Sequence, residues 1–287
     1  MEQIKLDYKI MGQGKQVIVF ENGLGSHNSD WHFIVEEIKS DAVVITYHRA
    51  GYGESMSSCS TRTTGQIAEE LNSMLNEIGL KNKIILVGHS FGGLCVQHFA
   101  KLYPDKVKGI VLVDSTSADF GNLYSLDLPV LFSHIAIDKL IEKWCELSNK
   151  TVQELQHLMH PVLSKEQLQL PEALHETIEE FSTNPVTFKT MATETDYWKL
   201  SSEQIKSIVD FPDIPLYVIA RDSEVSVRFY TERGIPEAEA VAYEDTWRKL
   251  QVEHSQLSKK GKLIIAEGSD HIVQLEKPDI VVNCIRE

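Results

Sequence analysis

The stretch that decides the fold reads Ile84-Ile85-Leu86-Val87-Gly88-His89-Ser90-Phe91-Gly92-Gly93-Leu94. Its first four residues form an unbroken aliphatic run, which is typical of a strand buried on both faces of a parallel sheet. The pattern G-x-S-x-G follows, and residues 93–103 then show the apolar spacing of a helix that stops at Pro104. The stretch predicts a buried strand, a sharp turn and a helix, with Ser90 in the turn.

The residue types at this turn suit nucleophilic chemistry. A serine between a strand and a helix adopts a strained backbone that exposes its hydroxyl above the edge of the sheet. Gly88 and Gly92 flank the turn, and their lack of a Cβ makes it possible. The amide of Phe91 begins the helix, where unpaired N–H groups favour developing negative charge. We predict a nucleophile at Ser90 and an oxyanion-hole amide at Phe91; the alternative is a Gly-rich turn with an incidental serine.

Outside this turn, short β-branched runs alternate with longer amphipathic stretches. The alternation predicts an α/β fold with a mostly parallel sheet flanked by helices. The expected strands are Ile4–Ile10, Gln16–Phe20, Ala42–Tyr47, Lys83–Val87, Gly109–Val113, Leu216–Ala220 and Lys262–Ala266. The expected helices include Gln66–Ile78, Gly93–Tyr103 and Pro278–Ile285.

Residues 115–210 break the alternation, because they contain no convincing strand. Thr151 and Glu154 form a capping-box pattern, and Pro171 is expected to open another short helix. We therefore predict a core of residues 1–114 and 211–287 with a helical insertion at 115–210. No Gly/Ser linker flanks the insertion, so it is expected to pack on the core.

A serine nucleophile needs a base, and His271 is the best-placed candidate. It lies in the loop after the last expected strand, where ligands of open parallel sheets gather. His89, His98 and His254 fit less well. His89 lies inside the serine turn itself, and its side chain should point away from the hydroxyl of Ser90.

A second oxyanion amide is expected after an early strand. The strand 17–20 is followed by Glu21-Asn22-Gly23-Leu24-Gly25. Two glycines allow a backbone N–H to face the reacting centre, and Leu24 is the natural donor. The alternative is a simple tight turn.

Composition excludes several classes of protein. The chain has 287 residues, with 42 acidic against 28 basic side chains and a net charge of −14, which argues against nucleic-acid binding. No run is long and apolar enough for a membrane helix, and the N-terminus lacks a signal-peptide pattern. The four cysteines, at positions 59, 95, 145 and 284, are scattered and suit a reducing cytoplasm. We expect a cytoplasmic protein with no metal and no organic cofactor.

Together these motifs resemble the α/β-hydrolase family, and the likeness extends over the whole chain. The motifs are Gly23-Leu24-Gly25, Arg49-Ala50-Gly51-Tyr52-Gly53-Glu54-Ser55, the serine turn, Gly268-Ser269-Asp270-His271 and Glu276-Lys277-Pro278. The chain is similar to the many bacterial relatives described as hydrolases or esterases of this fold. The resemblance implies that residues 115–210 are a cap between strands six and seven of the fold, which shapes the substrate pocket. Two residues depart from the pattern: Asn22 stands where many relatives carry His, and His48 where many carry Asp.

The acid that would orient the imidazole is not settled by the sequence. Asp222 and Glu224 follow the strand 216–220, where most members of the family place this acid, but Arg221 stands in the place of the usual Gly. Asp114 ends the strand 109–113, where some lipases of the fold carry it. Asp114 is the first choice, Asp222 and Glu224 are the alternatives, and a capping role is the alternative for Asp114 itself.

The resemblance implies a serine hydrolase that forms an acyl-enzyme on Ser90. A carboxylic ester is the expected substrate, with amide, lactone or C–C bond cleavage as alternatives. Residues 115–210 hold 15 acidic and 7 basic side chains, which favours a small, neutral and fairly apolar ester over an anionic one. A rival from another class is a non-hydrolytic ligand-binding or signalling member of the fold. The expected partner is a small-molecule substrate, and no oligomeric state is predicted.

Overall fold

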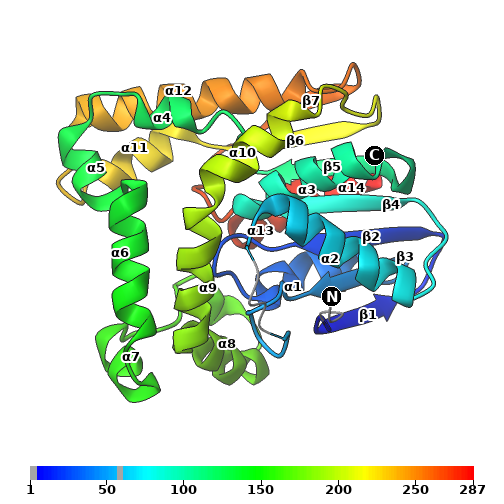
Figure 1. Ribbon diagram of the computed structural model, residues 1–287, viewed down its shortest axis with the longest axis horizontal. Helices are drawn as coiled ribbons and strands as arrows, with labels where there is room; N and C mark the ends of the chain where they lie inside the picture. Colours follow the sequence, from blue (N-terminus) through cyan, green and yellow to red (C-terminus); the bar gives the residue numbers. More distant parts are fainter. Residues whose placement is uncertain (1–4, 57–60) are drawn as a thin grey trace.

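The chain is described by a computed structural model over residues 5–56 and 61–287, and Figure 1 shows a central sheet with helices on both sides. The sheet has seven strands in the order β1-β3-β2-β4-β5-β6-β7. All neighbours from β3 to β7 pair in parallel, and β1 pairs antiparallel to β3 at one edge. The strands are β1 (Tyr8–Gly12), β2 (Gln16–Glu21), β3 (Ala42–Tyr47), β4 (Ile84–His89), β5 (Val107–Val113), β6 (Leu216–Arg221) and β7 (Gly261–Ala266).

Alternating side chains of each strand build two separate cores, one on each face of the sheet. In β2, Val17 and Val19 pack into one core, while Ile18 and Phe20 pack into the other. The first face is covered by α2 (Thr64–Glu77) and α3 (Phe91–Leu102). The second face is covered by α1 (His32–Ile38) and α14 (Pro278–Arg286). Burial on both faces explains why the inner strands are aliphatic throughout.

The predicted α/β architecture, a mostly parallel sheet flanked by helices, is confirmed, with shifts at the ends of elements. The first expected strand, Ile4–Ile10, is displaced: β1 begins at Tyr8 and reaches Gly12, and Ile4 lies outside the described residues. The helix expected from Gly93 begins at Phe91, directly after Ser90. Each of the other six expected strands overlaps an observed one.

A series of helices separates β5 from β6 in the chain. The expected position, between strands six and seven, is not confirmed, because only five described strands precede these helices. The capping box of Thr151 and Glu154 is present, and Pro171 precedes a single 3-10 turn before the next helix begins. The elements are α4 (Gly121–Tyr124), α5 (Pro129–Ile135), α6 (Ile137–Ser148), α7 (Val152–Leu158), η3 (Gln167–Gln169), η4 (Glu172–Leu174), α8 (His175–Ser182), α9 (Pro185–Asp196) and α10 (Trp198–Ser207).

A second helical segment, α11 (Ser223–Thr231) and α12 (Glu237–Ser255), separates β6 from β7. Figure 1 shows α12 running beside α4 and α11. Leu123 of α4, Leu131 of α5 and Trp247 of α12 belong to one buried apolar cluster. Helices before and after β6 therefore share a core, so the helical layer is not confined to residues 115–210.

Short elements complete the chain: η1 (Asn28–Trp31), η2 (Pro104–Lys106) and α13 (Val273–Glu276). Within residues 5–56 and 61–287, no helix is long and apolar enough to cross a membrane. The same residues contain no group of three or more His, Cys, Asp or Glu side chains placed to hold a metal ion. Cys95, Cys145 and Cys284 are free thiols, and Cys59 lies outside the described residues.

Candidate active site

Ser90 occupies the turn between β4 and α3, at the carboxyl edge of the sheet. Its backbone has φ 52° and ψ −123°, a region that side-chain-bearing residues rarely adopt. In the described part of the chain, Asp114 at φ 40° is the one other non-glycine residue with positive φ. Hydrogen bonds from the Ser90 amide to the Val113 carbonyl (3.1 Å) and from the Thr116 amide to the Ser90 carbonyl (3.0 Å) hold the turn in place. Strained backbone of this kind concentrates at functional sites.

The glycines around Ser90 are required by close backbone approach. A Cβ on Gly88 would lie 2.7 Å from the carbonyl oxygen of Gly92. A Cβ on Gly92 would lie 2.4 Å from the carbonyl oxygens of both Glu21 and Asn22. The serine turn therefore packs directly against the loop that follows β2.

The structure brings together Ser90, His271 and Asp114, three residues singled out by the sequence. The Oγ of Ser90 lies 3.0 Å from Nε2 of His271, and Nδ1 of His271 lies 2.6 Å from Oδ2 of Asp114. With Nδ1 protonated, the imidazole donates to Asp114 and accepts from the serine hydroxyl. The His271 side chain is 37% exposed while that of Asp114 is fully buried, so solvent reaches the imidazole and not the carboxylate.

Asp114 accepts four hydrogen bonds. Oδ1 accepts from the backbone amide of Arg221 (3.2 Å) and from Nε1 of Trp247 (2.8 Å), and Oδ2 accepts from Nη1 of Arg221 (3.0 Å) as well as from His271. Burial raises the pKa of Asp114, but the adjacent Arg221 guanidinium, followed by His271 and Trp247, outweighs it and holds the pKa below its ordinary value. Asp114 is therefore an ionised, fixed acceptor for the imidazole.

The alternative acids, Asp222 and Glu224, are not brought to His271. Asp222 caps α11 by accepting from the Glu224 amide (3.0 Å), and its other oxygen accepts from the Gly268 amide (2.9 Å). Glu224 is exposed. Asp270 contacts the hydroxyl of Ser226. Within the described residues, none of these three carboxylates bonds to the imidazole.

The other histidines considered as bases have different roles in the structure. Nε2 of His89 lies 2.9 Å from the His271 carbonyl oxygen, so His89 supports the loop that carries His271. Burial lowers the pKa of His89 to about 3, which keeps its ring neutral. His98 contacts the hydroxyl of Thr64 (2.7 Å), and His254 is buried in α12.

Leu24 and Phe91 carry the two amides expected to form an oxyanion hole. In the described part of the chain, neither amide is engaged by a hydrogen bond to protein. Phe91 is the first residue of α3, where the amide has no intrahelical acceptor and the helix dipole is positive. Leu24 packs beside Phe91 in one apolar cluster, so the two expected donors come from adjacent segments.

The loop that carries Leu24 is tied to the helical insertion by Arg49. Its guanidinium donates to the carbonyl oxygens of Asn22 (2.6 Å) and Gly23 (3.2 Å) and to both carboxylate oxygens of Glu194 in α9 (2.8 and 2.9 Å). It also pairs with Glu21 at 2.8 Å. All three charged side chains are buried. A bidentate pair of this kind fixes geometry, so Arg49 holds α9 against the loop.

The two departures from the family pattern have local explanations. Asn22 accepts from Nε1 of Trp31 (2.7 Å) and donates to Oδ1 of Asn28 (2.6 Å), so its side chain anchors the loop. His48 lies 3.3 Å from a carboxylate oxygen of Asp7 and stacks on Phe181. Burial lowers the pKa of His48, which favours a neutral ring here.

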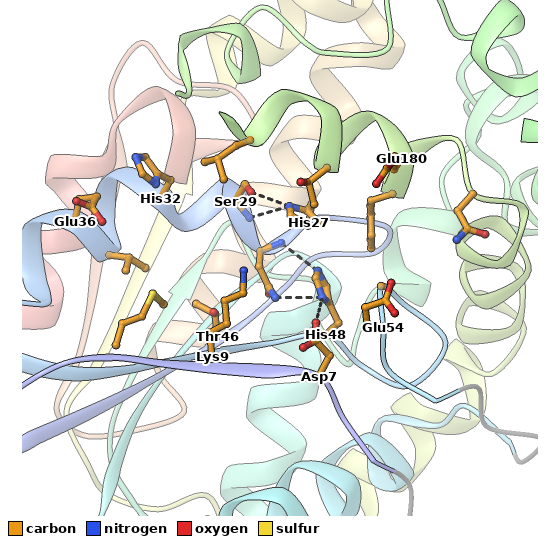
Figure 2. A pocket seen from close by; sticks show the side chains of 18 residues that line it. Asp7, Lys9, His27, Ser29, His32, Glu36, Thr46, His48, Glu54 and Glu180 are labelled. Carbon is orange, nitrogen blue, oxygen red and sulfur yellow. Dashed lines mark hydrogen bonds and ion pairs between the residues drawn. The ribbon is translucent and has the colours of Figure 1, made fainter. Parts of the chain in front are cut away.

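A cavity of about 520 Å³ lies beside this loop and apart from Ser90. Figure 2 shows His27 and His48 side by side in its lining, with ring centroids 4.9 Å apart, and Asp7 beside His48. Its walls come from β1, α1, β3, the loops after β2 and β3, and the η4–α8 segment, and neither Ser90 nor His271 lines it. This cavity and the Ser90–His271–Asp114 cluster are separate places in the molecule.

Sequence reasoning missed the side chains that surround Asp114. Arg221 was noted as an unexpected residue, but its contact with Asp114 was not foreseen. Glu244 and Trp247 had no signal of their own, because they lie in a long helix whose docking the sequence does not specify. Glu194 was likewise one of many acidic residues in the insertion.

Comparison with known proteins identifies the family of the chain. A family model described as alpha/beta hydrolase fold matches residues 16–278. The uncharacterized protein YqjL of Bacillus subtilis is 31% identical over 144 residues, which cover 50% of this chain and 56% of that protein. The chain thus aligns with little more than half the length of this curated relative.

Two solved structures share the fold. An esterase from Thermogutta terrifontis superposes with a TM-score of 0.63 at 18% identity, covering 99% of this chain and 92% of its own. The enol-lactonase from Burkholderia xenovorans superposes with a TM-score of 0.68 at 15% identity, covering 100% and 98%. The chain belongs to the alpha/beta hydrolase fold family.

Proposed function

We propose that this chain is a serine hydrolase that cleaves small, neutral, fairly apolar carboxylic esters. The observation that carries the proposal is the unbroken hydrogen-bonded series from Ser90 Oγ through His271 to Asp114, at 3.0 and 2.6 Å. A nucleophile, a base and an orienting acid in contact are what acyl transfer requires. Membership of a hydrolase family supports the same reaction class.

The first half of the reaction acylates the enzyme. Ser90 Oγ attacks the ester carbonyl carbon while Nε2 of His271 takes the hydroxyl proton. The carbonyl oxygen becomes an oxyanion that accepts hydrogen bonds from the free amides of Leu24 and Phe91, each worth roughly 2.7–4 kcal/mol of barrier. The C–O bond then breaks, and His271 returns the proton to the departing alkoxide, which leaves as an alcohol.

The second half restores the free enzyme. His271 removes a proton from water, and the resulting hydroxide attacks the acyl carbon through a second oxyanion. Collapse of this intermediate releases the carboxylic acid, and the proton returns to Ser90. Asp114 remains ionised throughout and stabilises the imidazolium that forms twice in each cycle. Each of these steps uses groups of this chain alone.

The preference for neutral substrates follows from charge. Residues 115–210, which we propose form the cap over the site, carry a large share of the net charge of −14. An acidic covering layer repels anionic esters over a distance set by ionic strength. The test compares p-nitrophenyl butyrate with mono-p-nitrophenyl succinate, which carries a free carboxylate. The neutral butyrate should have the higher kcat/KM, and 0.5 M NaCl should reduce the difference between the two kcat/KM values. A faster anionic ester would contradict the substrate assignment.

The same experiment separates hydrolysis from ligand binding alone. A hydrolase releases p-nitrophenol with saturation kinetics that Ser90→Ala abolishes, whereas a binding protein gives saturable ligand affinity without product. Adding a lactone and an anilide to the panel compares the kcat/KM for lactone and amide cleavage with that for ester cleavage. Turnover unchanged in Ser90→Ala would overturn the proposed mechanism.

A further inference from the structure

Arg221 places a buried positive charge beside the proposed acid and base. It ends β6, where the strand meets the site, and its side chain is 6% exposed. Nη1 lies 3.0 Å from Oδ2 of Asp114 and 3.5 Å from Nδ1 of His271. A cation this close to an imidazole acts on the proton that the imidazole must gain during catalysis.

Glu244 supplies the charge that balances this cation. The Nε of Arg221 donates to Oε2 of Glu244 at 3.1 Å, and Nη2 donates to Oε1, so the two side chains form a bidentate pair. Trp247, one turn further along α12, lies under the guanidinium with the Arg221 carbon 4.4 Å from the ring centroid. Both acidic partners of Arg221 are buried. Removing either charge would leave its partner uncompensated in a medium that screens poorly.

We propose that Arg221 and Glu244 form a positioning pair that sets the pH range of catalysis by balancing the charge of Asp114 opposite His271. The inference rests on the proposed function, since it assigns roles toward the Ser90–His271–Asp114 series. Arg221 holds the carboxylate of Asp114 with two donors, and Glu244 keeps Arg221 in place and offsets its charge.

The charge balance gives the pair a signature in pH. With Asp114 and Glu244 ionised and Arg221 protonated, the cluster carries a net charge of −1. Removing Arg221 makes it −2, which stabilises protonated His271; removing the Glu244 charge makes it 0, which disfavours protonation. Removing both restores −1. The acid limb of a kcat/KM profile reports the protonation of the free enzyme's base. Its midpoint should therefore rise when the cluster becomes more negative and fall when it becomes less negative.

Several other titratable or charged side chains lie near the cluster, and none of them is substituted in the variants. They are His89 from β4, Tyr230 from α11, Tyr243 and Arg248 from α12, and Asp270 from the loop before α13. Burial lowers the pKa of His89 to about 3 and raises the pKa of Tyr230 to about 12, so both are neutral across the assay range. Arg248 donates to the Arg221 carbonyl oxygen at 2.6 Å, which secures the backbone on which Arg221 stands.

The test is a pH profile of kcat/KM for p-nitrophenyl butyrate in the wild-type chain and in Arg221→Met, Glu244→Gln and the double variant. The acid-limb midpoint should rise by about 1 pH unit in Arg221→Met and fall by about 1 pH unit in Glu244→Gln. It should return to within about 0.3 pH unit of wild type in the double variant, because the net charge is restored. Arg221→Lys, which keeps the charge but not the forked geometry, should lower kcat with little change in midpoint.

Each outcome decides the inference. Midpoints that all stay within about 0.3 pH unit of wild type while melting temperatures change would assign the pair a purely structural role and overturn it. Shifts in the same direction in both single variants would overturn it as well. If Arg221→Met does not fold, the isosteric Glu244→Gln variant decides alone. A fall in its acid-limb midpoint supports the inference, and an unchanged midpoint overturns it. A wild type that does not hydrolyse any ester would instead overturn the proposed function, so the two failures are distinguishable.

Discussion

Replacing Asp114 with Asn changes one atom at the centre of the proposed catalytic series. Four donors point at its two oxygens: two from Arg221, one from Trp247 and one from His271. An amide has a single oxygen, so in either orientation two of these donors face an NH₂ group. If the NH₂ faces His271, it donates to Nδ1 and forces the proton onto Nε2. The imidazole would then donate to Ser90 instead of accepting its proton.

The expected cost is large. Wrong-tautomer substitution of a triad acid lowers kcat by about 10⁴-fold, which is about 5 kcal/mol of barrier at 1.36 kcal/mol per tenfold. The assay is p-nitrophenyl butyrate hydrolysis at pH 8, with circular dichroism and melting temperature to verify folding. Asp222→Asn is the matched control: Asn caps a helix about as well as Asp and loses only the hydrogen bond from the Gly268 amide, so its activity should stay within about tenfold of wild type. A folded Asp114→Asn enzyme with more than a tenth of wild-type activity would refute the assignment, as would a larger loss in Asp222→Asn.

Three further perturbations follow from the packing. Gly92→Ala should lower kcat by at least about 10²-fold with a smaller change in melting temperature, because its Cβ would displace the Asn22 carbonyl and with it the Leu24 loop; wild-type turnover would contradict this. Arg49→Met should destabilise the fold by about 3–5 kcal/mol in urea unfolding, since buried Glu21 loses its ion pair and buried Glu194 keeps only the longer contact with Arg62 at 3.6 Å; a loss under 1 kcal/mol would argue against the buried network. Burial lowers the pKa of His254 to about 4 against 6.5 unfolded, so the unfolded state takes up the proton first and stability falls as pH drops below 6.5. Between pH 7.5 and 5.5, the free energy of unfolding of His254→Leu should therefore fall by about 1 kcal/mol less than that of wild type. The same pH dependence of the unfolding free energy in both proteins would contradict this role of His254.

The elements nearest the serine turn were predictable because their signals are local. A buried strand, a G-x-S-x-G turn and a helix follow one another without interruption, and steric crowding at Gly88 and Gly92 leaves little choice of residue. The parallel sheet was likewise predictable, because strands buried on both faces must be aliphatic along their length. The expected edge strand is displaced, since β1 has no buried residue and therefore a weaker apolar pattern.

The surroundings of the acid were not predictable. Trp247 reaches Asp114 across 133 residues, and Glu194 reaches Arg49 across 145. Such contacts depend on how α9 and α12 dock on the sheet, which amphipathic spacing does not determine. The sequence also left three acids open, because each ends or follows a strand at the same edge of the sheet. Geometry distinguishes them: Asp222 is engaged as a helix cap, and Asp114 contacts the imidazole.

The central claim is that Ser90 is a nucleophile activated by His271. The most direct measurement is covalent labelling with a fluorophosphonate, followed by intact mass and peptide mapping of wild type, Ser90→Ala and His271→Ala. The account predicts one adduct per wild-type chain, located on Ser90, none in Ser90→Ala, and labelling of His271→Ala slowed by at least about 10²-fold. An unlabelled wild type, or an adduct that persists in Ser90→Ala, would contradict it.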